Sequence, residues 1–123
     1  MQARVSPMIH VPDVDATANW YESIGFEIRD KGRECDEGEV VFALLRFGES
    51  TIMLDAGGKP SDAFRREVDL YIHTSEVDAL YEQLKSRADI VEPPHDTFYG
   101  AREFILRDCN RFWITFAEPG GNR

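Results

Sequence analysis

An internal repeat is the feature of this chain that most limits what it can fold into. Residues 9–16, IHVPDVDA, return 63 positions later as residues 72–79, IHTSEVDA. Residues 42–44, FAL, return 62 positions later as residues 104–106, FIL. Two matches in the same order, at nearly the same offset, predict a duplicated module of about sixty residues. Because ligand sites often lie between such modules, the repeat also indicates where function is to be sought.

The acidic balance of the chain excludes two classes of partner. The sequence has 14 Lys and Arg residues against 23 Asp and Glu residues, which gives a formal net charge of −9. Nucleic acids and anionic membrane surfaces both require clustered positive charge on the protein. We therefore expect no nucleic acid and no membrane as a partner. The same charge mildly favours a cationic ligand.

The cysteines and the N-terminal residues indicate the cellular compartment of the protein. Cys35 and Cys109 stand without a CxxC motif or a Cys/His cluster of the zinc-binding type. Free thiols are typical of a reducing compartment. No apolar segment of the signal-peptide type follows Met1, and no apolar run is long enough to span a membrane. The sequence therefore predicts a cytoplasmic protein.

A helix is expected after each copy of the repeat. In the first copy, apolar residues recur at helical spacing over residues 16–24, and Asp13 or a neighbour supplies the N-cap. In the second copy, the apolar stripe covers residues 77–84, and residues 75–78, SEVD, predict a capping box. Because each helix begins inside a repeated segment, the repeat indicates the fold more directly than it indicates a binding or catalytic function.

Strands are expected on both sides of each helix, so each half reads β-α-β-β-β. We predict an α+β fold of two tandem βαβββ modules, with a mixed sheet curled around a cleft. A single domain would cover residues 1–123, with module 1 at about 1–56, a linker at 57–66 and module 2 at about 67–123. The expected strands are 5–11, 26–29, 40–45 and 51–55 in the first half, and 68–73, 89–91, 103–107 and 112–116 in the second. Pro93 and Pro94 are expected to mark a turn.

Alternation along the expected strands separates two faces. One face is uniformly apolar and should lie under the helices. The other mixes acids, aromatic rings, methionine and histidine, whereas an ordinary solvated face would be more uniformly polar. This mixed face predicts a cleft or an interface. Its members include Met8, His10, Met53, Asp55, Asp69, Tyr71, His73, Glu103, Ile105, Arg107, Trp113 and Thr115.

Several words of the sequence resemble the vicinal oxygen chelate superfamily. In the first half they are residues 11–15, VPDVD, and 20–26, WYESIGF. In the second half they are residues 77–81, VDALY, 99–104, YGAREF, and 107–108, RD. This superfamily contains glyoxalase I, extradiol dioxygenases, fosfomycin-resistance enzymes and bleomycin-resistance proteins. The resemblance implies two modules around a concave cleft that a second subunit often completes, so we expect a homodimer.

The resemblance also assigns four metal-ligand positions, and this chain departs from the family there. Those positions fall on Ser6, Met53, Asp69 and Thr115. Only Asp69 is a competent ligand for a hard divalent metal, and such a site needs about three His or carboxylate ligands. We therefore predict no metal and no other cofactor.

A second departure is the turn after residue 107. The family pattern is Asp-Pro-x-Gly, and this chain has residues 108–111, DCNR. The loss of Gly removes the residue that best tolerates positive φ, and Asn110 is the expected substitute.

The function that these features favour is metal-independent binding of a small cationic or aromatic molecule, as in drug-sequestering proteins of the bleomycin-resistance type. Trp113 and Tyr71 would stack on flat groups, and acidic side chains would attract positive charge. The predicted ligand-binding residues are Met8, His10, Met53, Asp55, Asp69, Tyr71, His73, Tyr99, Glu103, Arg107, Trp113 and Thr115.

Two alternatives remain open. The first is a metal-dependent enzyme of the glyoxalase or dioxygenase type with displaced ligands, in which His10 and His73 would bind the metal beside Asp55. The second is a non-catalytic interaction module whose mixed face is buried against a protein partner.

Overall fold

The structure is a computed structural model that describes residues 1–120. The chain divides into two compact units, Met1–Ser61 (unit 1) and Asp62–Arg123 (unit 2). Each unit contains one helix and one four-stranded mixed sheet, in the order β-α-β-β-β. The predicted α+β fold with two repeated βαβββ modules is therefore confirmed. Within the described part of the chain, no helix is both long and apolar enough to cross a membrane.

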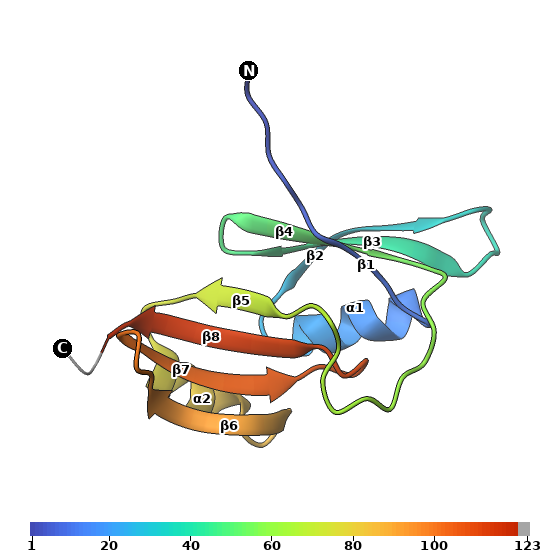
Figure 1. Cartoon of the computed structure of the whole chain (residues 1–123). Helices are drawn as coiled ribbons and strands as arrows, with labels where there is room; N and C mark the ends of the chain where they lie inside the picture. The colour runs from blue at the N-terminus through green and yellow to red at the C-terminus, as the bar shows by residue number, and fades with distance from the viewer. Residues whose placement is uncertain (121–123) are drawn as a thin grey trace. The chain divides into compact units, whose positions relative to one another are not determined.

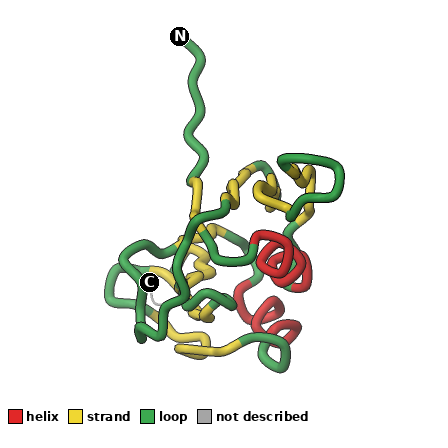
Figure 2. Tube along the Cα trace, turned by 90° about the vertical axis from the view of Figure 1, so that its right-hand side faces the viewer, coloured by secondary structure: helices red, strands yellow, loops and turns green. Residues whose placement is uncertain are grey.

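Unit 1 is built from five elements in the predicted order (Figure 1). They are β1 (Met8–His10), α1 (Val14–Ser23), β2 (Glu27–Arg33), β3 (Val40–Phe47) and β4 (Ser50–Asp55). The strand order in the sheet is β1-β4-β3-β2, with β1 parallel to β4 and the other pairs antiparallel. Before β1 the chain runs out from the sheet as an extended segment (Figure 2).

Unit 2 repeats this topology. Its elements are β5 (Leu70–His73), α2 (Val77–Leu84), β6 (Asp89–Asp96), β7 (Ala101–Arg107) and β8 (Trp113–Pro119). The strand order is β5-β8-β7-β6, and β5 is parallel to β8. The match between the two orders explains the sequence repeat, because the repeated words begin at equivalent first strands and equivalent helix starts.

In unit 1 the helix covers the apolar face of the sheet. Asp13 caps α1 as predicted, because its carboxylate accepts a hydrogen bond of 3.0 Å from the backbone N–H of Ala16. Gly25, at φ 114°, follows the helix in a conformation that other residues rarely adopt. Each large apolar side chain buried here contributes roughly 1.5–3 kcal/mol. The core includes Ile9, Val11, Val14, Ala18, Tyr21, Ile24, Ala43, Leu45, Ile52 and Leu54.

In unit 2 the core centres on two stacked rings. The centroids of Phe104 and Phe116 lie 5.0 Å apart with planes at 17°, and the Tyr81 ring of α2 meets Phe104 edge-on at 5.4 Å. Because Phe104 and Phe116 are paired on neighbouring strands, their side chains share the face that α2 covers. The strand alternation had predicted this apolar face correctly.

The predicted capping box at the start of α2 is wrong. The N-cap residue is Glu76, and its side chain makes no capping hydrogen bond. Instead, the backbone N–H of Val77 donates to Oε1 of Glu118, on β8, over 3.0 Å. The start of α2 is therefore capped by a carboxylate from a distant strand, and not by a residue of the predicted capping box.

The predicted turn at Pro93 and Pro94 is also wrong, because both residues lie within β6. Proline lacks a backbone N–H, so a central strand would lose ladder hydrogen bonds there. β6 is an edge strand that pairs only with β7 within its sheet. The register shifts between Glu92 and His95, so the two prolines coincide with a bulge that the edge position tolerates.

The turn before β8 keeps a residue at positive φ, but that residue is not Asn110. Arg111 has φ 71° and occupies the place of the glycine in the family pattern. Asp108 holds the turn, because its Oδ1 accepts hydrogen bonds from the backbone N–H groups of Asn110, at 2.7 Å, and Phe112, at 2.8 Å. The Asp108 side chain therefore makes the turn possible without glycine.

Asp108→Ala should destabilise the fold by about 2 kcal/mol, because it leaves two backbone N–H groups without their acceptor, one of them buried. Urea unfolding followed by circular dichroism would measure the change in the free energy of unfolding. Asp62→Ala, at an exposed position, is the matched control and should change stability by less than about 0.5 kcal/mol. Equal effects of the two substitutions would contradict this account of the turn.

Candidate ligand-binding site

The strand register of unit 2 brings many of the predicted site residues onto one face. Tyr71 on β5 is paired with Thr115 on β8, and Thr115 is paired with Ile105 on β7. Trp113 is paired with Arg107 on the neighbouring strand. Paired residues in a ladder project to the same side of a sheet. The mixed face predicted for the second module therefore exists as one continuous surface of unit 2.

A buried carboxylate lies on this mixed face. Glu103 is only 4% exposed, although it is a charged residue. Its Oε2 accepts hydrogen bonds from the hydroxyl groups of Tyr71, at 2.6 Å, and Tyr99, at 2.5 Å. Both phenols therefore donate to the same carboxylate oxygen. Glu103, Tyr71 and Tyr99 are called the Glu103 cluster below.

The cluster raises the pKa values of both phenols. Burial of its hydroxyl group, followed by the hydrogen bond to Glu103, raises the pKa of Tyr71 well above the ordinary value. For Tyr99 the hydrogen bond to Glu103 comes first and burial second, and the pKa is raised in the same direction. Both phenols therefore remain protonated donors at neutral pH.

The rings of the cluster are accessible even though its carboxylate is not. Tyr71 is 46% exposed and Tyr99 is 57% exposed. The His73 ring meets the Tyr71 ring edge-on, with centroids 5.2 Å apart. The cluster thus combines negative charge below the surface with aromatic rings at the surface.

Trp113 is covered by a segment that the sequence had assigned to a linker. Residues 63–66 are called the strap below, and two of them, Phe64 and Arg65, lie against the Trp113 ring. The guanidinium carbon of Arg65 lies 4.2 Å from the ring centroid, and the Phe64 ring meets it edge-on at 5.7 Å. The indole N–H donates to the backbone carbonyl of Phe64 over 3.1 Å. Trp113 is therefore not an open stacking surface in this structure.

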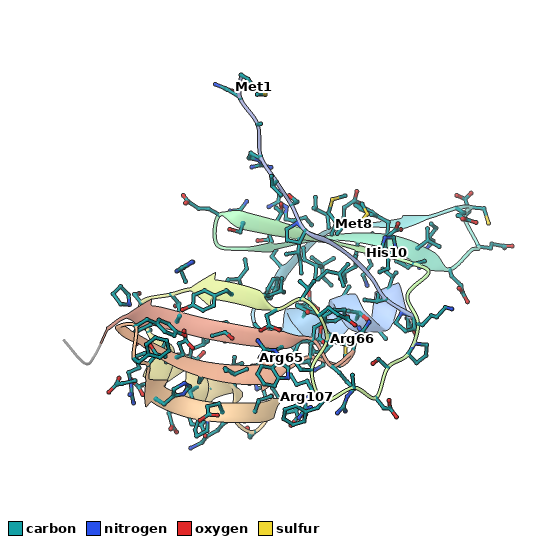
Figure 3. All side chains as sticks on the ribbon, viewed as in Figure 1. Met1, Met8, His10, Arg65, Arg66 and Arg107 are labelled. Atoms are coloured by element: carbon teal, nitrogen blue, oxygen red, sulfur yellow. The ribbon has the colours of Figure 1, made fainter. Side chains whose placement is uncertain are left out.

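Other arginine contacts hold the strap on the sheet. Arg107 donates to the carbonyl of Phe64 at 2.8 Å, and Arg111 donates to the carbonyl of Ala63. Arg107 also pairs with Asp89 on the adjacent strand β6, over 2.9 Å. Figure 3 labels Arg65, Arg66 and Arg107. The strap was not predicted from the sequence, although Phe64, Arg65 and Arg66 in succession are an unusual composition for a linker.

Unit 1 has its own mixed face, on β1 and β4. Met8 is paired with Met53, and His10 is paired with Asp55, so these four predicted residues lie side by side. Nδ1 of His10 lies 3.0 Å from the carbonyl of Ala56 and 3.9 Å from Oδ2 of Asp55. Met8 and His10 are labelled in Figure 3.

A depression lined largely by arginine was not predicted from the sequence. It belongs to unit 1, and its volume of about 390 Å³ is in the range of small-molecule sites. It gathers three positive side chains and one negative side chain, on a chain whose net charge is −9. The lining combines residues of β2, β3 and β4 with Arg4 of the segment before β1, which lie far apart in the sequence. The lining residues are Arg4, Arg29, Leu44, Arg46, Glu49 and Thr51.

Comparisons with known proteins agree with this architecture. Residues 4–123 match the model of the glyoxalase/bleomycin resistance protein/dioxygenase superfamily. The chain belongs to this superfamily. No curated protein matches the chain in sequence.

Solved structures show the same fold. TioX from Micromonospora sp. ML1 is similar with a TM-score of 0.75 and 22% identity, over 96% of this chain and 99% of that one. A bleomycin-binding protein complexed with bleomycin has a TM-score of 0.71 and 18% identity, over 95% and 98%. A glyoxylase/bleomycin resistance protein/dioxygenase domain from Frankia sp. EAN1pec has a TM-score of 0.75 and 19% identity, over 100% and 96%.

The residues at the superfamily's metal positions do not fit a metal ion. Ser6 shares a hydrogen bond of 2.9 Å with Thr51, and Asp69 is paired with Arg65 at 2.5 Å. Met53 and Thr115 offer a thioether and a hydroxyl, which are poor ligands for hard divalent metals. Within residues 1–120, no group of three or more His, Cys, Asp and Glu side chains is arranged to hold a metal.

The raised pKa of Tyr71 should make the fold less stable at alkaline pH. The folded state retains the phenolic proton above about pH 10, where the unfolded chain releases it. The free energy of unfolding should therefore be constant below that pH, as far as Tyr71 is concerned, and should fall above it. Tyr71→Phe should reduce the slope, as measured by urea unfolding from about pH 8 to about pH 11. An unchanged slope in the variant would contradict the role of this phenol.

Proposed function

We propose that this protein binds a small aromatic molecule with positive charge, and that binding needs no metal. The single observation that carries the proposal is the Glu103 cluster. A carboxylate that is 4% exposed, beneath two half-exposed phenol rings, is a costly arrangement for a surface with no ligand. A cation that approaches the rings gains attraction both from the ring faces and from the carboxylate behind them.

Further acidic groups support a cationic ligand. Asp69 lies two residues before Tyr71, and Asp55 lies on the mixed face of unit 1. The net charge of −9 would raise the local concentration of cations around the protein. One solved structure with this fold is a bleomycin-binding protein complexed with bleomycin, which supports a drug-like ligand and a role in antibiotic resistance for this chain as well.

The exposed apolar groups support a second copy of the chain as a partner. Met8 is 48% exposed, and Tyr71 and Tyr99 are similarly accessible. Large exposed apolar side chains are typical of ligand sites and of subunit interfaces. We therefore propose a homodimer in which the mixed face of unit 2 contacts the ligand, and we propose a cytoplasmic location for it. The other ligand contacts stay predictions, and they are His10, Met53, Asp55, His73, Arg107 and Thr115.

The proposal predicts that Glu103→Gln weakens the binding of aromatic cations at least about tenfold, because it removes the charge but keeps an acceptor for the phenols. Isothermal titration calorimetry with bleomycin and with N-methylquinolinium would measure the dissociation constants. Neutral quinoline is the uncharged probe of matched shape, and it should bind more weakly than the cation.

Glu82→Gln is the matched control, since it makes the same change in charge on α2, where Glu82 pairs with Lys85 at 2.7 Å. This variant should bind like the unmodified protein. Failure of both cations to bind the unmodified protein, or an equal loss in the two variants, would overturn the proposal.

Metal independence predicts a second result. Protein purified without chelators should carry well under one equivalent of Ni, Zn, Fe or Mn by plasma mass spectrometry. Treatment with EDTA should leave the dissociation constant for N-methylquinolinium unchanged, because only one of the side chains at the superfamily's metal positions, Asp69, is a competent metal ligand and it is paired with Arg65. A stoichiometric metal that is lost together with binding would favour the metal-dependent alternative instead.

A further inference from the structure

We propose that Trp113 and Asp69 form a subsite for a planar organic cation of the guanidinium or amidinium class, and that Arg65 of the strap fills this subsite in the free protein. The inference rests on the proposed function, because it names the chemical group that one end of the unit 2 mixed face would recognise. The inference adds a binding position for the planar cation, and it identifies Arg65 as a side chain that competes for this position.

The contacts of Arg65 reproduce the two requirements for binding a planar cation. Its guanidinium carbon lies 4.2 Å from the centroid of the Trp113 ring, which is the distance of a cation–π contact. Its Nη2 lies 2.5 Å from Oδ2 of Asp69, and its Nε lies 3.5 Å from Oδ1. The fork of the guanidinium therefore faces the carboxylate while its centre lies by the indole ring. An amidinium has the same planar pair of N–H donors.

The position of Arg65 permits its replacement by an external cation. The Arg65 side chain is 55% exposed, and Phe64 beside it is 66% exposed. The strap itself belongs to no helix or strand. Arg66 differs, because it is part-buried, donates to the carbonyl of Asn110 at 2.9 Å and lies over the ring of buried Phe112. Arg66 can therefore anchor the strap while Arg65 leaves the subsite.

The subsite adjoins the Glu103 cluster. Trp113 precedes Thr115 by two residues on β8, and Asp69 precedes Tyr71 by two residues. Residues two apart on an extended chain lie on the same face, about 7 Å from each other. A ligand with an aromatic body on the Tyr71 ring therefore has its next group at the level of Trp113 and Asp69. This spacing predicts a ligand in which a planar cation follows an aromatic ring.

Arg65 would act as a tethered competitor. A group on a short tether has an effective concentration in the millimolar range, so it can outcompete a weak free ligand. The apparent affinity for an external cation is reduced by the fraction of molecules in which the subsite is open. If the subsite is open in about a tenth of the molecules, removal of Arg65 raises the affinity about tenfold.

The test uses benzamidine, an aromatic amidinium, and the fluorescence of Trp113 in the full chain. Trp20→Phe is introduced first, because the chain has two tryptophans. In that background, Arg65→Ala should lower the dissociation constant for benzamidine about tenfold. Addition of Asp69→Asn should remove the gain. Arg65→Gln, which keeps the aliphatic stem over the ring, provides a second variant if the first unfolds, and it should also bind benzamidine more tightly.

Two controls make the result specific. Arg29→Ala removes an exposed arginine that pairs with Glu27 in unit 1, and it should leave benzamidine binding unchanged. Benzamide, the uncharged counterpart, should gain little from Arg65→Ala. The subsite is refuted if Arg65→Ala and Arg65→Gln bind benzamidine no more tightly than Arg29→Ala, or if benzamide gains as much as benzamidine.

The outcome is separable from that of the proposed function. Calorimetry on Glu103→Gln with N-methylquinolinium reports on the Glu103 cluster, whereas benzamidine fluorescence reports on Trp113. If N-methylquinolinium does not bind the unmodified protein in the calorimeter while Arg65→Ala gains affinity for benzamidine, the proposed function is overturned and the subsite is supported. The reverse pattern would support the proposed function and overturn the subsite.

Discussion

The parallel pairing of the first and last strands of each module is the constraint on which the remaining structure depends. β1 lies beside β4, and β5 lies beside β8, in the same direction. Parallel neighbours need a long crossover, and here that crossover contains a helix and two strands. The helix then occupies one face of each sheet. The opposite face is the one that carries the candidate binding residues.

This constraint explains why the sequence predicted the fold so well. Helical spacing, strand alternation and the two repeated segments are three separate signals, and all three indicate the same β-α-β-β-β order. One failure occurred where a distant residue replaced a local signal, because Glu118 caps α2 from the last strand of unit 2. That contact cannot be predicted from residues within a few positions of the helix. The turn in which Arg111 replaces glycine is different, because Asp108 holds it from within the same turn.

The strand face that carries the candidate site could be predicted from the sequence, but the burial and the contacts of its residues could not. Alternation placed Tyr71, Glu103 and Trp113 on one face, as the register of β5, β7 and β8 confirms. It could not reveal that Glu103 is buried while Tyr71 is half exposed, since burial depends on neighbours from three strands and a turn. It also could not reveal that Trp113 is covered, because the strap has no periodic pattern by which its position could be inferred.

The prolines of β6 have a consequence for how unit 2 behaves at high concentration. An exposed edge strand offers a row of backbone donors and acceptors to any other strand, and this is a common route to aggregation. Pro93 and Pro94 remove backbone donors at this point of the strand, and the bulge beside them distorts the remaining row. The feature that made this segment look like a turn therefore protects the open edge of the sheet from pairing with strands of other molecules.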